Sequence, residues 1–142
     1  MGRPQDSLGF LVSDVARLMR RAFERSLDGS SLTLAQARAL VYVARHEGIR
    51  QVDLAERLEV QPMTLARLVD QLAEAGLVER RSDPDDRRVY RLHPTAAAAP
   101  QLAAIEQGVV AVRKEAARGL DRAQVAALLE ALQRIRDNLS DH

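Results

Sequence analysis

The chain has 142 residues, of which 46% are hydrophobic and 29% are charged, and this is enough for one domain with a buried core. It contains no cysteine, which excludes disulfides, thiolate metal sites and thiol-based redox sensing. No run approaches the roughly 18 apolar residues that span a bilayer, and residues 1–7 lack the apolar segment of a signal peptide. We therefore expect a cytoplasmic protein without a membrane partner.

The charge is close to balanced. The formal net charge is +1, and residues 50–91 hold eight arginines against nine carboxylates. Bulk positive charge therefore cannot attract a polyanion to this chain. Any binding of a polyanion has to come from arginines that are gathered on one face.

Two helices are predicted in the first third of the chain. Residues 8–27 place apolar side chains at helical spacing, and Gly29 follows the end of this helix. Thr33 and Gln36 have the spacing of a capping box. This pattern predicts a second helix that begins after Thr33 and runs to about Arg45.

Two shorter helices follow, separated by a turn at residues 59–60. The first is predicted over residues 51–58, and its expected buried residues are Val52, Ala55 and Leu58. Pro62 suits the first position of the next helix, because the amide that proline lacks would be unpaired there in any case. Gly76 marks the end of that helix.

The remaining elements are a hairpin and two more helices. Residues 78–81 and 89–92 are predicted to be strands, joined by the turn-forming sequence SDPDDRR. Thr95 is the expected cap of a helix that runs to about residue 118, and Pro100 should kink this helix or delay its start. Asp121 and Gln124 should open the last helix.

The predicted fold is mainly α with a small β-hairpin. Two short amphipathic helices with a turn between them, followed at once by a cationic hairpin, are typical of a winged helix-turn-helix, which here occupies residues 32–95. The chain is expected to be one domain over residues 1–142. The helical regions 1–31 and 96–142 have long apolar stripes, so we expect them to pack against a second copy of the chain and form a dimerisation region.

The interpretation as a DNA-binding protein depends on two sets of side chains. Helix residues three apart share a face, so polar residues at the start of the fourth helix can reach base edges in a major groove. The hairpin arginines can enter a minor groove, and Asp86 is placed to hold Arg88 and reduce the entropy that it loses there. The candidate residues are Gln61, Pro62, Met63, Thr64, Arg67, Arg81, Asp86, Arg87 and Arg88, with Arg50 and Gln51 as candidate phosphate contacts. The alternative is a solvated helix face beside an exposed cluster of ion pairs.

Other chemistry is sparse in this sequence. His46, His93 and His142 do not have the spacing of metal ligands, and no phosphate-binding loop, nucleophile elbow or pair of catalytic carboxylates is present. We therefore expect neither an enzyme nor a bound metal or cofactor. Tyr42, Arg45 and His46 near the end of the second helix, together with Arg17, Arg20 and Arg21 of the first, are candidates to border an anion-accepting pocket. The alternative for these residues is a charged helix surface.

The segment from Leu32 to Thr95 resembles the winged helix-turn-helix of the MarR family of bacterial transcriptional regulators. The motifs that carry the resemblance are LTLAQARALVYVARHEG, QVDLAERLEVQPMTLARLVDQLAEAGLVERR and DPDDRR. The flanking helices match the family's dimerisation elements by position. The chain departs from the family pattern at Arg50, where a capping Thr or Ser is usual, at Gln71, and in the sequence HPTAAAA after the hairpin.

The resemblance implies a homodimeric repressor that binds a pseudo-palindromic DNA operator. It further implies that Arg88 probes the minor groove, that Asp86 orients it, and that the start of the fourth helix reads the major groove. Many members of the family release DNA when a small aromatic or phenolic compound binds between the dimerisation and DNA-binding regions. The alternative function is a winged-helix protein-interaction module that does not bind DNA.

Overall fold

A computed structural model describes residues 7–140; residues 1–6, 141 and His142 lie outside the described part. The helices are α1 (Leu8–Ser26), α2 (Leu34–Arg45), α3 (Gln51–Leu58), α4 (Pro62–Glu74), α5 (Ala98–Ala116) and α6 (Arg122–Ser140). The strands are β1 (Ile49–Arg50), β2 (Val78–Ser82) and β3 (Tyr90–Pro94). Within residues 7–140, no helix is long and apolar enough to cross a membrane.

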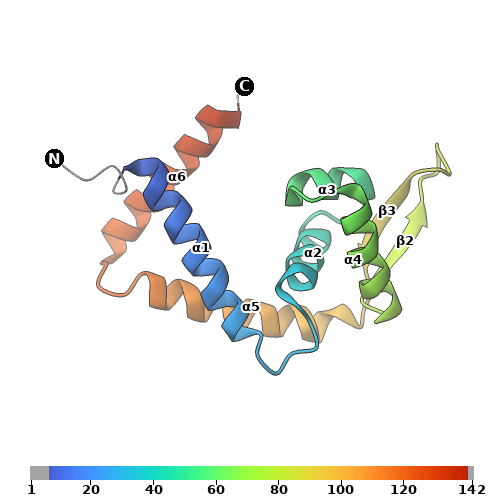
Figure 1. Cartoon of the computed structure of the whole chain (residues 1–142), viewed down its shortest axis with the longest axis horizontal. Helices are drawn as coiled ribbons and strands as arrows, with labels where there is room; N and C mark the ends of the chain where they lie inside the picture. Colours follow the sequence, from blue (N-terminus) through green and yellow to red (C-terminus); the bar gives the residue numbers. More distant parts are fainter. Residues whose placement is uncertain (1–6, 141–142) are drawn as a thin grey trace.

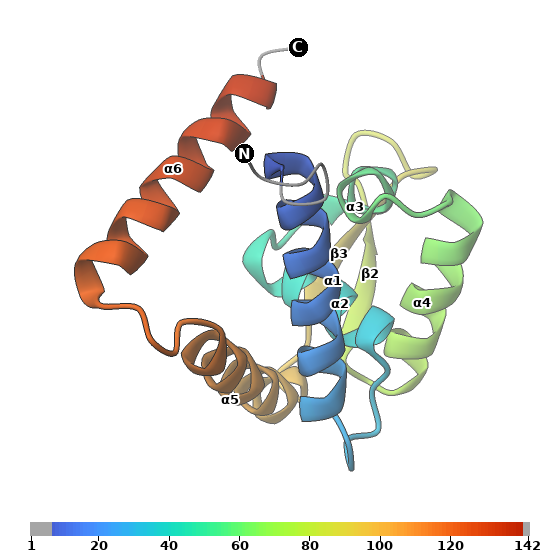
Figure 2. The ribbon, with the colours of Figure 1, turned by 60° about the vertical axis from the view of Figure 1, so that its left-hand side comes forward.

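The molecule has a compact winged part and an extended helical part. α2, α3, α4 and the sheet lie together, and α5 leads away from them towards α6 (Figure 1). α1 packs on α5 where Gly108 allows a close approach, because a Cβ at Gly108 would lie 2.6 Å from the Ser26 hydroxyl. α6 stands away from the winged part in both views (Figures 1 and 2).

One apolar core holds the winged part together. The largest fully buried side chains come from α2, α3, α4 and β3, and they are Leu40, Val43, Leu54, Leu65, Val69, Leu72 and Leu92. Burial of each such side chain contributes roughly 1.5–3 kcal/mol. Packing of the apolar side of α4 into the core that it shares with α2, α3 and β3 therefore determines how α4 is oriented.

The local signals for the helices are confirmed. The Thr33 hydroxyl accepts from the Gln36 amide while the Gln36 side chain accepts from the Thr33 amide, and Asp121 and Gln124 make the same pair of bonds before α6. α3 spans residues 51–58 as predicted, and Pro62 is the first residue of α4.

Two predictions about helices are wrong. Val52 is 59% exposed, whereas Leu54 is fully buried together with Ala55 and Leu58. Two residues along an α-helix correspond to a rotation of about 200°, so burial of Leu54 turns Val52 to the opposite side. Thr95 does not cap α5: its hydroxyl donates to the Gly76 carbonyl, and α5 begins later, at Ala98.

The sheet has three strands in the order β1-β3-β2, all antiparallel. The sequence did not predict β1, because a strand of two residues has no detectable alternation. Ile49 pairs with Leu92, so β1 connects the end of α2 to the hairpin. The hairpin strands end at residues 82 and 94, slightly later than predicted.

Candidate nucleic-acid interface

The start of α4 presents a polar face to solvent. Gln61 is the N-cap residue, and residues 61–64 and Arg67 are all exposed, with Met63 at 78%. The opposite side of α4 buries Leu65, Val69 and Leu72. Core packing therefore does not account for Met63, Thr64 or Arg67, and these three side chains are available to a ligand.

The turn between α3 and α4 uses a left-handed residue. Glu59 has φ 55° and is the only non-glycine residue in the described part with positive φ. This conformation ends α3 and lets the Val60 amide donate to the Ala55 carbonyl at 3.0 Å. The turn places the first residues of α4 immediately beyond the end of α3.

The tip of the β2–β3 hairpin holds one arginine in a fixed but exposed position. Arg88 Nε donates to Asp86 Oδ1 at 3.1 Å, and the Arg88 backbone amide donates to the same oxygen at 3.0 Å. The Arg88 side chain is nevertheless 91% exposed. The hydrogen bonds from Arg88 lower the pKa of Asp86 below its usual value. The expected Asp86–Arg88 pair is thus present, while its part in binding remains a prediction.

The start of the hairpin loop, just after β2, contains a buried carboxylate that the sequence did not single out. Asp83 Oδ1 accepts from the Asp85 amide at 2.8 Å, and Asp83 Oδ2 accepts from Arg91 Nε at 2.7 Å. Arg91 also donates from Nη1 to the Gly48 carbonyl at 2.8 Å. The bond from the Asp85 amide, and then the contact with Arg91, lower the pKa of Asp83. Asp83 and Arg91 thereby fasten the hairpin to the residue that precedes β1.

The hairpin arginines fall into two groups. Arg80 and Arg91 have side chains that are 24% and 42% exposed, and their guanidinium groups are bonded to other elements of the molecule. Arg81 pairs with Glu79 at 2.6 Å and remains exposed. Arg87 is exposed and forms no ion pair with a described residue.

The two candidate phosphate contacts already have partners within the chain. Arg50 is the N-cap residue of α3 and makes no side-chain cap bond; its Nε pairs with Asp53 at 3.1 Å. Gln51 Oε1 accepts from Arg80 Nε at 3.0 Å. The side-chain amide nitrogen of Gln51, Nε2, therefore remains to donate to a phosphate.

The structure does not bring all of the predicted pocket residues together. Arg20, Tyr42 and Arg45 line a cavity of about 450 Å³ between α1, α2 and α5, and Leu129 of α6 also lines it. Arg21 lines a different hollow, and Arg17 pairs with Asp14 at 3.6 Å. The reason is the 100° step of the helix, which turns Arg20 and Phe23 towards α2 and turns Arg17 and Arg21 aside.

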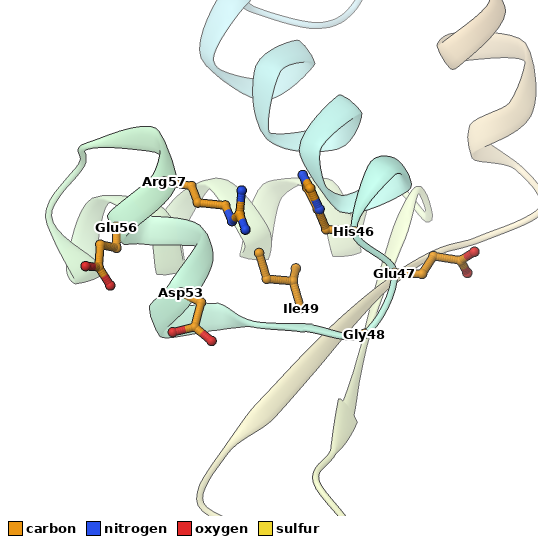
Figure 3. Close-up of a pocket in the computed structure, with 7 residues that line it drawn as sticks. All are labelled: His46, Glu47, Gly48, Ile49, Asp53, Glu56 and Arg57. Carbon is orange, nitrogen blue, oxygen red and sulfur yellow. The ribbon is translucent and has the colours of Figure 1, made fainter. Parts of the chain in front are cut away.

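His46 lines a separate and more open hollow of about 660 Å³ at the end of α2 (Figure 3). Glu47, Asp53, Glu56 and Arg57 also line it, so both signs of charge are present. No group of three or more His, Asp or Glu side chains within residues 7–140 is placed to hold a metal ion. The hollow therefore presents no defined ligand chemistry.

The fold and this surface define a class of protein. A helix-turn-helix (α3–α4), an exposed polar face on the second helix and an adjacent cationic hairpin together form a winged helix-turn-helix. Within residues 7–140, the helices α1, α2, α5 and α6 and the short strand β1 complete the architecture.

Comparison with known proteins identifies the family. Residues 32–90 match the model of the MarR family. The whole chain is similar to a crystal structure of MarR, with a TM-score of 0.88 and 26% identity over 99% of this chain and 96% of that one. It is also similar to wild-type apo MarR from E. coli, with a TM-score of 0.81 and 28% identity; the match covers 91% of this chain and 96% of that one. The chain belongs to the MarR family of transcriptional regulators.

A curated relative is similar over part of its length. The Thauera aromatica protein named "Putative transcriptional regulatory protein for hcr operon" is 34% identical over 96 residues. The match covers 68% of this chain and 58% of that protein.

We predict that Asp83 makes the stability of the fold depend on pH. Because folding lowers its pKa, ionised Asp83 stabilises the native state above the usual value of 3.8, and this stabilisation is lost as the pH falls below it. Asp83→Asn should therefore be less stable than the parent at neutral pH, and the difference should shrink below about pH 4. Urea unfolding over a pH series measures this.

Asp85→Asn is the matched control, because the Asp85 side chain is exposed and only its backbone amide bonds to Asp83. It should unfold like the parent at each pH. A difference between Asp83→Asn and the parent that stays constant from neutral to acid pH would contradict the prediction.

Proposed function

We propose that this protein is a homodimeric, sequence-specific DNA-binding regulator, and that it acts as a ligand-responsive repressor. The observation that carries the proposal is the combination of an exposed polar face at the start of α4 with an arginine that is exposed and yet held at the hairpin tip. Neither feature is required by the core. Together they match the two grooves that a winged helix-turn-helix contacts.

The chemistry of the α4 face suits a major groove. Arg67 can donate two bonds to a guanine, Thr64 and Gln61 can bond bases or phosphates, and Met63 can contact a thymine methyl. Pro62 leaves no amide hydrogen at the first helical position, so the free amides that follow it are available to a phosphate. The face therefore offers both base readout and phosphate contacts.

The hairpin suits a minor groove. Arg88 extends into solvent while Asp86 restricts its rotamers, so less conformational entropy is lost when it enters a narrow groove. Arg81 and Arg87 lie on the same hairpin and can neutralise the flanking phosphates. The Arg88 backbone amide, Nε and Nη2 all donate to the Asp86 carboxylate, which leaves Nη1 of the guanidinium to donate to DNA.

The proposed dimer rests on the terminal helices. α6 has 19 residues and buries none of its side chains, and the exposed apolar side chains on it are Leu128, Leu129, Leu132 and Leu139. α1 likewise buries none and exposes Leu8, Phe10, Leu11, Val12, Val15 and Leu18. A helix of this length is marginal alone, so an apolar face this large favours a second copy of the chain. Two-fold symmetry then implies a pseudo-palindromic operator of roughly 16–20 base pairs.

The proposed effector site is the cavity between α1, α2 and α5. Its walls are mostly apolar and include Phe23, Tyr42 and Val109, whereas its charged lining residues are all arginines: Arg20, Arg38, Arg45 and Arg113. Apolar walls with a few convergent cations favour a small aromatic or phenolic anion. The cavity lies between the helices of the proposed dimer region and the winged part, so its occupant can influence both.

We predict different consequences for the two exposed arginines. Arg67→Ala should cost about 1–3 kcal/mol of binding free energy and relax the preference at one operator position if Arg67 reads a base. Arg88→Ala should weaken binding across many sequences, most where the minor groove is narrow, and Asp86→Ala should do so more mildly. Fluorescence anisotropy with operator duplexes selected by the parent protein measures the affinities.

Arg57→Ala is the control, because it removes an equal charge from α3 on the side that faces His46 (Figure 3). Its affinity for the operator duplex should be almost the same as that of the parent. If Arg88→Ala also binds like the parent, the wing is only a charged loop. If the parent binds no duplex at all, the winged-helix interaction module becomes the better proposal.

We predict that the terminal helices hold a dimer. The parent should sediment as a dimer at micromolar concentration, and Leu128→Glu with Leu132→Glu should shift it towards monomer, because two charges would replace apolar contacts. Val52→Glu on α3 places a charge at an exposed apolar position outside the terminal helices and should leave the dimer unchanged. A parent protein that sediments as a stable monomer would rule out the proposed dimer.

We predict that the cavity binds aromatic anions. Isothermal titration should show binding of benzoate, and Arg45→Ala should weaken it by removing a lining cation. Val109→Trp should abolish binding by filling the cavity, whereas His46→Ala, which changes the other hollow, should not alter it. Benzoate binding that survives Val109→Trp would place the effector elsewhere.

A further inference from the structure

Arg80 is a hairpin arginine that points into the molecule instead of towards solvent. Its side chain is 24% exposed, compared with 59% for the neighbouring Arg81. It lies on β2 opposite Leu92 in the register of the hairpin. Its position therefore requires an explanation other than contact with DNA.

The Arg80 guanidinium connects the hairpin to both helices of the helix-turn-helix. Nε donates to Gln51 Oε1 on α3 at 3.0 Å, and Nη2 donates to the Ala66 carbonyl on α4 at 3.2 Å. Nη2 also lies 2.7 Å from Asp70 Oδ1 on α4. The guanidinium carbon is 6.0 Å from the centre of the Tyr90 ring on β3.

These partners adjoin or belong to the proposed contact residues. The Ala66 carbonyl belongs to the peptide that joins Ala66 to Arg67, and Gln51 is the first residue of α3. Gln51, Pro62, Arg88 and Tyr90 line one groove of about 230 Å³ between α3, α4 and the hairpin. A change at Arg80 thus alters how the two groove-contacting elements are spaced.

We propose that Arg80 is a positioning residue for DNA binding: it fixes the hairpin against α4 so that Arg67 and Arg88 reach their two grooves at the same time. This inference rests on the proposed DNA-binding function. Arginine suits the task because its planar fork can serve a side-chain amide, a carbonyl and a carboxylate in one plane. A lysine ammonium could keep the charge near Asp70 but could not satisfy all three acceptors in this geometry.

The test measures affinity for a duplex selected by the parent protein from a pool with about 20 randomised base pairs. Arg80→Met keeps the apolar stem and removes every donor, and it should weaken binding by about tenfold or more. The affinity of Arg80→Lys for the duplex should lie between those of Arg80→Met and the parent. Arg57→Met is the matched control for loss of charge, and it should change the affinity by less than about twofold.

The decisive measurement is the coupling between Arg80 and Arg88. In the parent, Arg88→Ala reduces affinity by some factor; in the Arg80→Met background this factor should shrink towards one, because a hairpin that is no longer fixed gains little from Arg88. Thermal unfolding by circular dichroism identifies the temperature at which each variant is folded, and binding is measured below it. If Arg80→Met does not fold, Arg80→Lys and Asp70→Asn serve in the same cycle.

Two results would overturn the inference: Arg80→Met binding as tightly as Arg57→Met, or an Arg88→Ala factor that is the same in both backgrounds. The second result would mean that Arg80 contributes charge or stability without positioning the hairpin. A parent protein that selects and binds no duplex overturns the proposed function instead, and this is seen before any variant is made.

Discussion

α4 packs into the core through Leu65, Val69 and Leu72, which lie along one side of the helix and are fully or almost fully buried. Helical periodicity then leaves Met63, Thr64 and Arg67 no position except the solvent side. The same core holds Leu92 of β3, so the hairpin has one apolar anchor in common with α4. Exposed polar residues at the start of α4 and exposed arginines at the hairpin tip are consequences of this shared burial.

Pairing between charges explains how a chain with net charge +1 can still present a cationic surface. Among residues 50–91, Arg50, Arg80, Arg81, Arg88 and Arg91 each pair with a carboxylate, while Arg57, Arg67 and Arg87 form no ion pair within the described part. The carboxylates therefore do more than cancel charge. Asp70 and Asp83 hold Arg80 and Arg91, which connect the hairpin to other elements, and Asp86 holds an arginine that stays exposed. Binding to a polyanion then depends on placement, which the pairs fix, rather than on total charge.

Helix starts could be predicted from the sequence where their determinants are local: Thr33 with Gln36, Pro62, and Asp121 with Gln124 act within one turn. The start of α5 was mispredicted because the Thr95 hydroxyl bonds to Gly76, which is 19 residues away. The Asp86–Arg88 pair was predictable for the same reason. The roles of Arg80 and Arg91 were not, because Gln51 is 29 residues from Arg80 and Gly48 is 43 residues from Arg91. Periodicity carries no information about such separations. The cavity was only partly predicted, since choosing Arg20 over Arg17 and Arg21 requires knowing how α1 is rotated against α2.

α5 is the element through which the two parts of the molecule can influence each other. Thr95 bonds to the Gly76 and Leu77 carbonyls just beyond α4, so the start of α5 is tied to the end of α4. Nineteen residues of helix then carry this connection for about 28 Å towards α6. Ile105, Val109 and Val112 of α5 also line the arginine-rich cavity. In the proposed dimer, an occupant that changes the spacing between α1, α2 and α5 must therefore move each winged part relative to the two-fold axis. The two half-sites of such an operator lie about one helical turn apart, so the two copies of α4 must have that same separation. A small rotation at the cavity is enough to change this separation and misalign the copies of α4 with their half-sites.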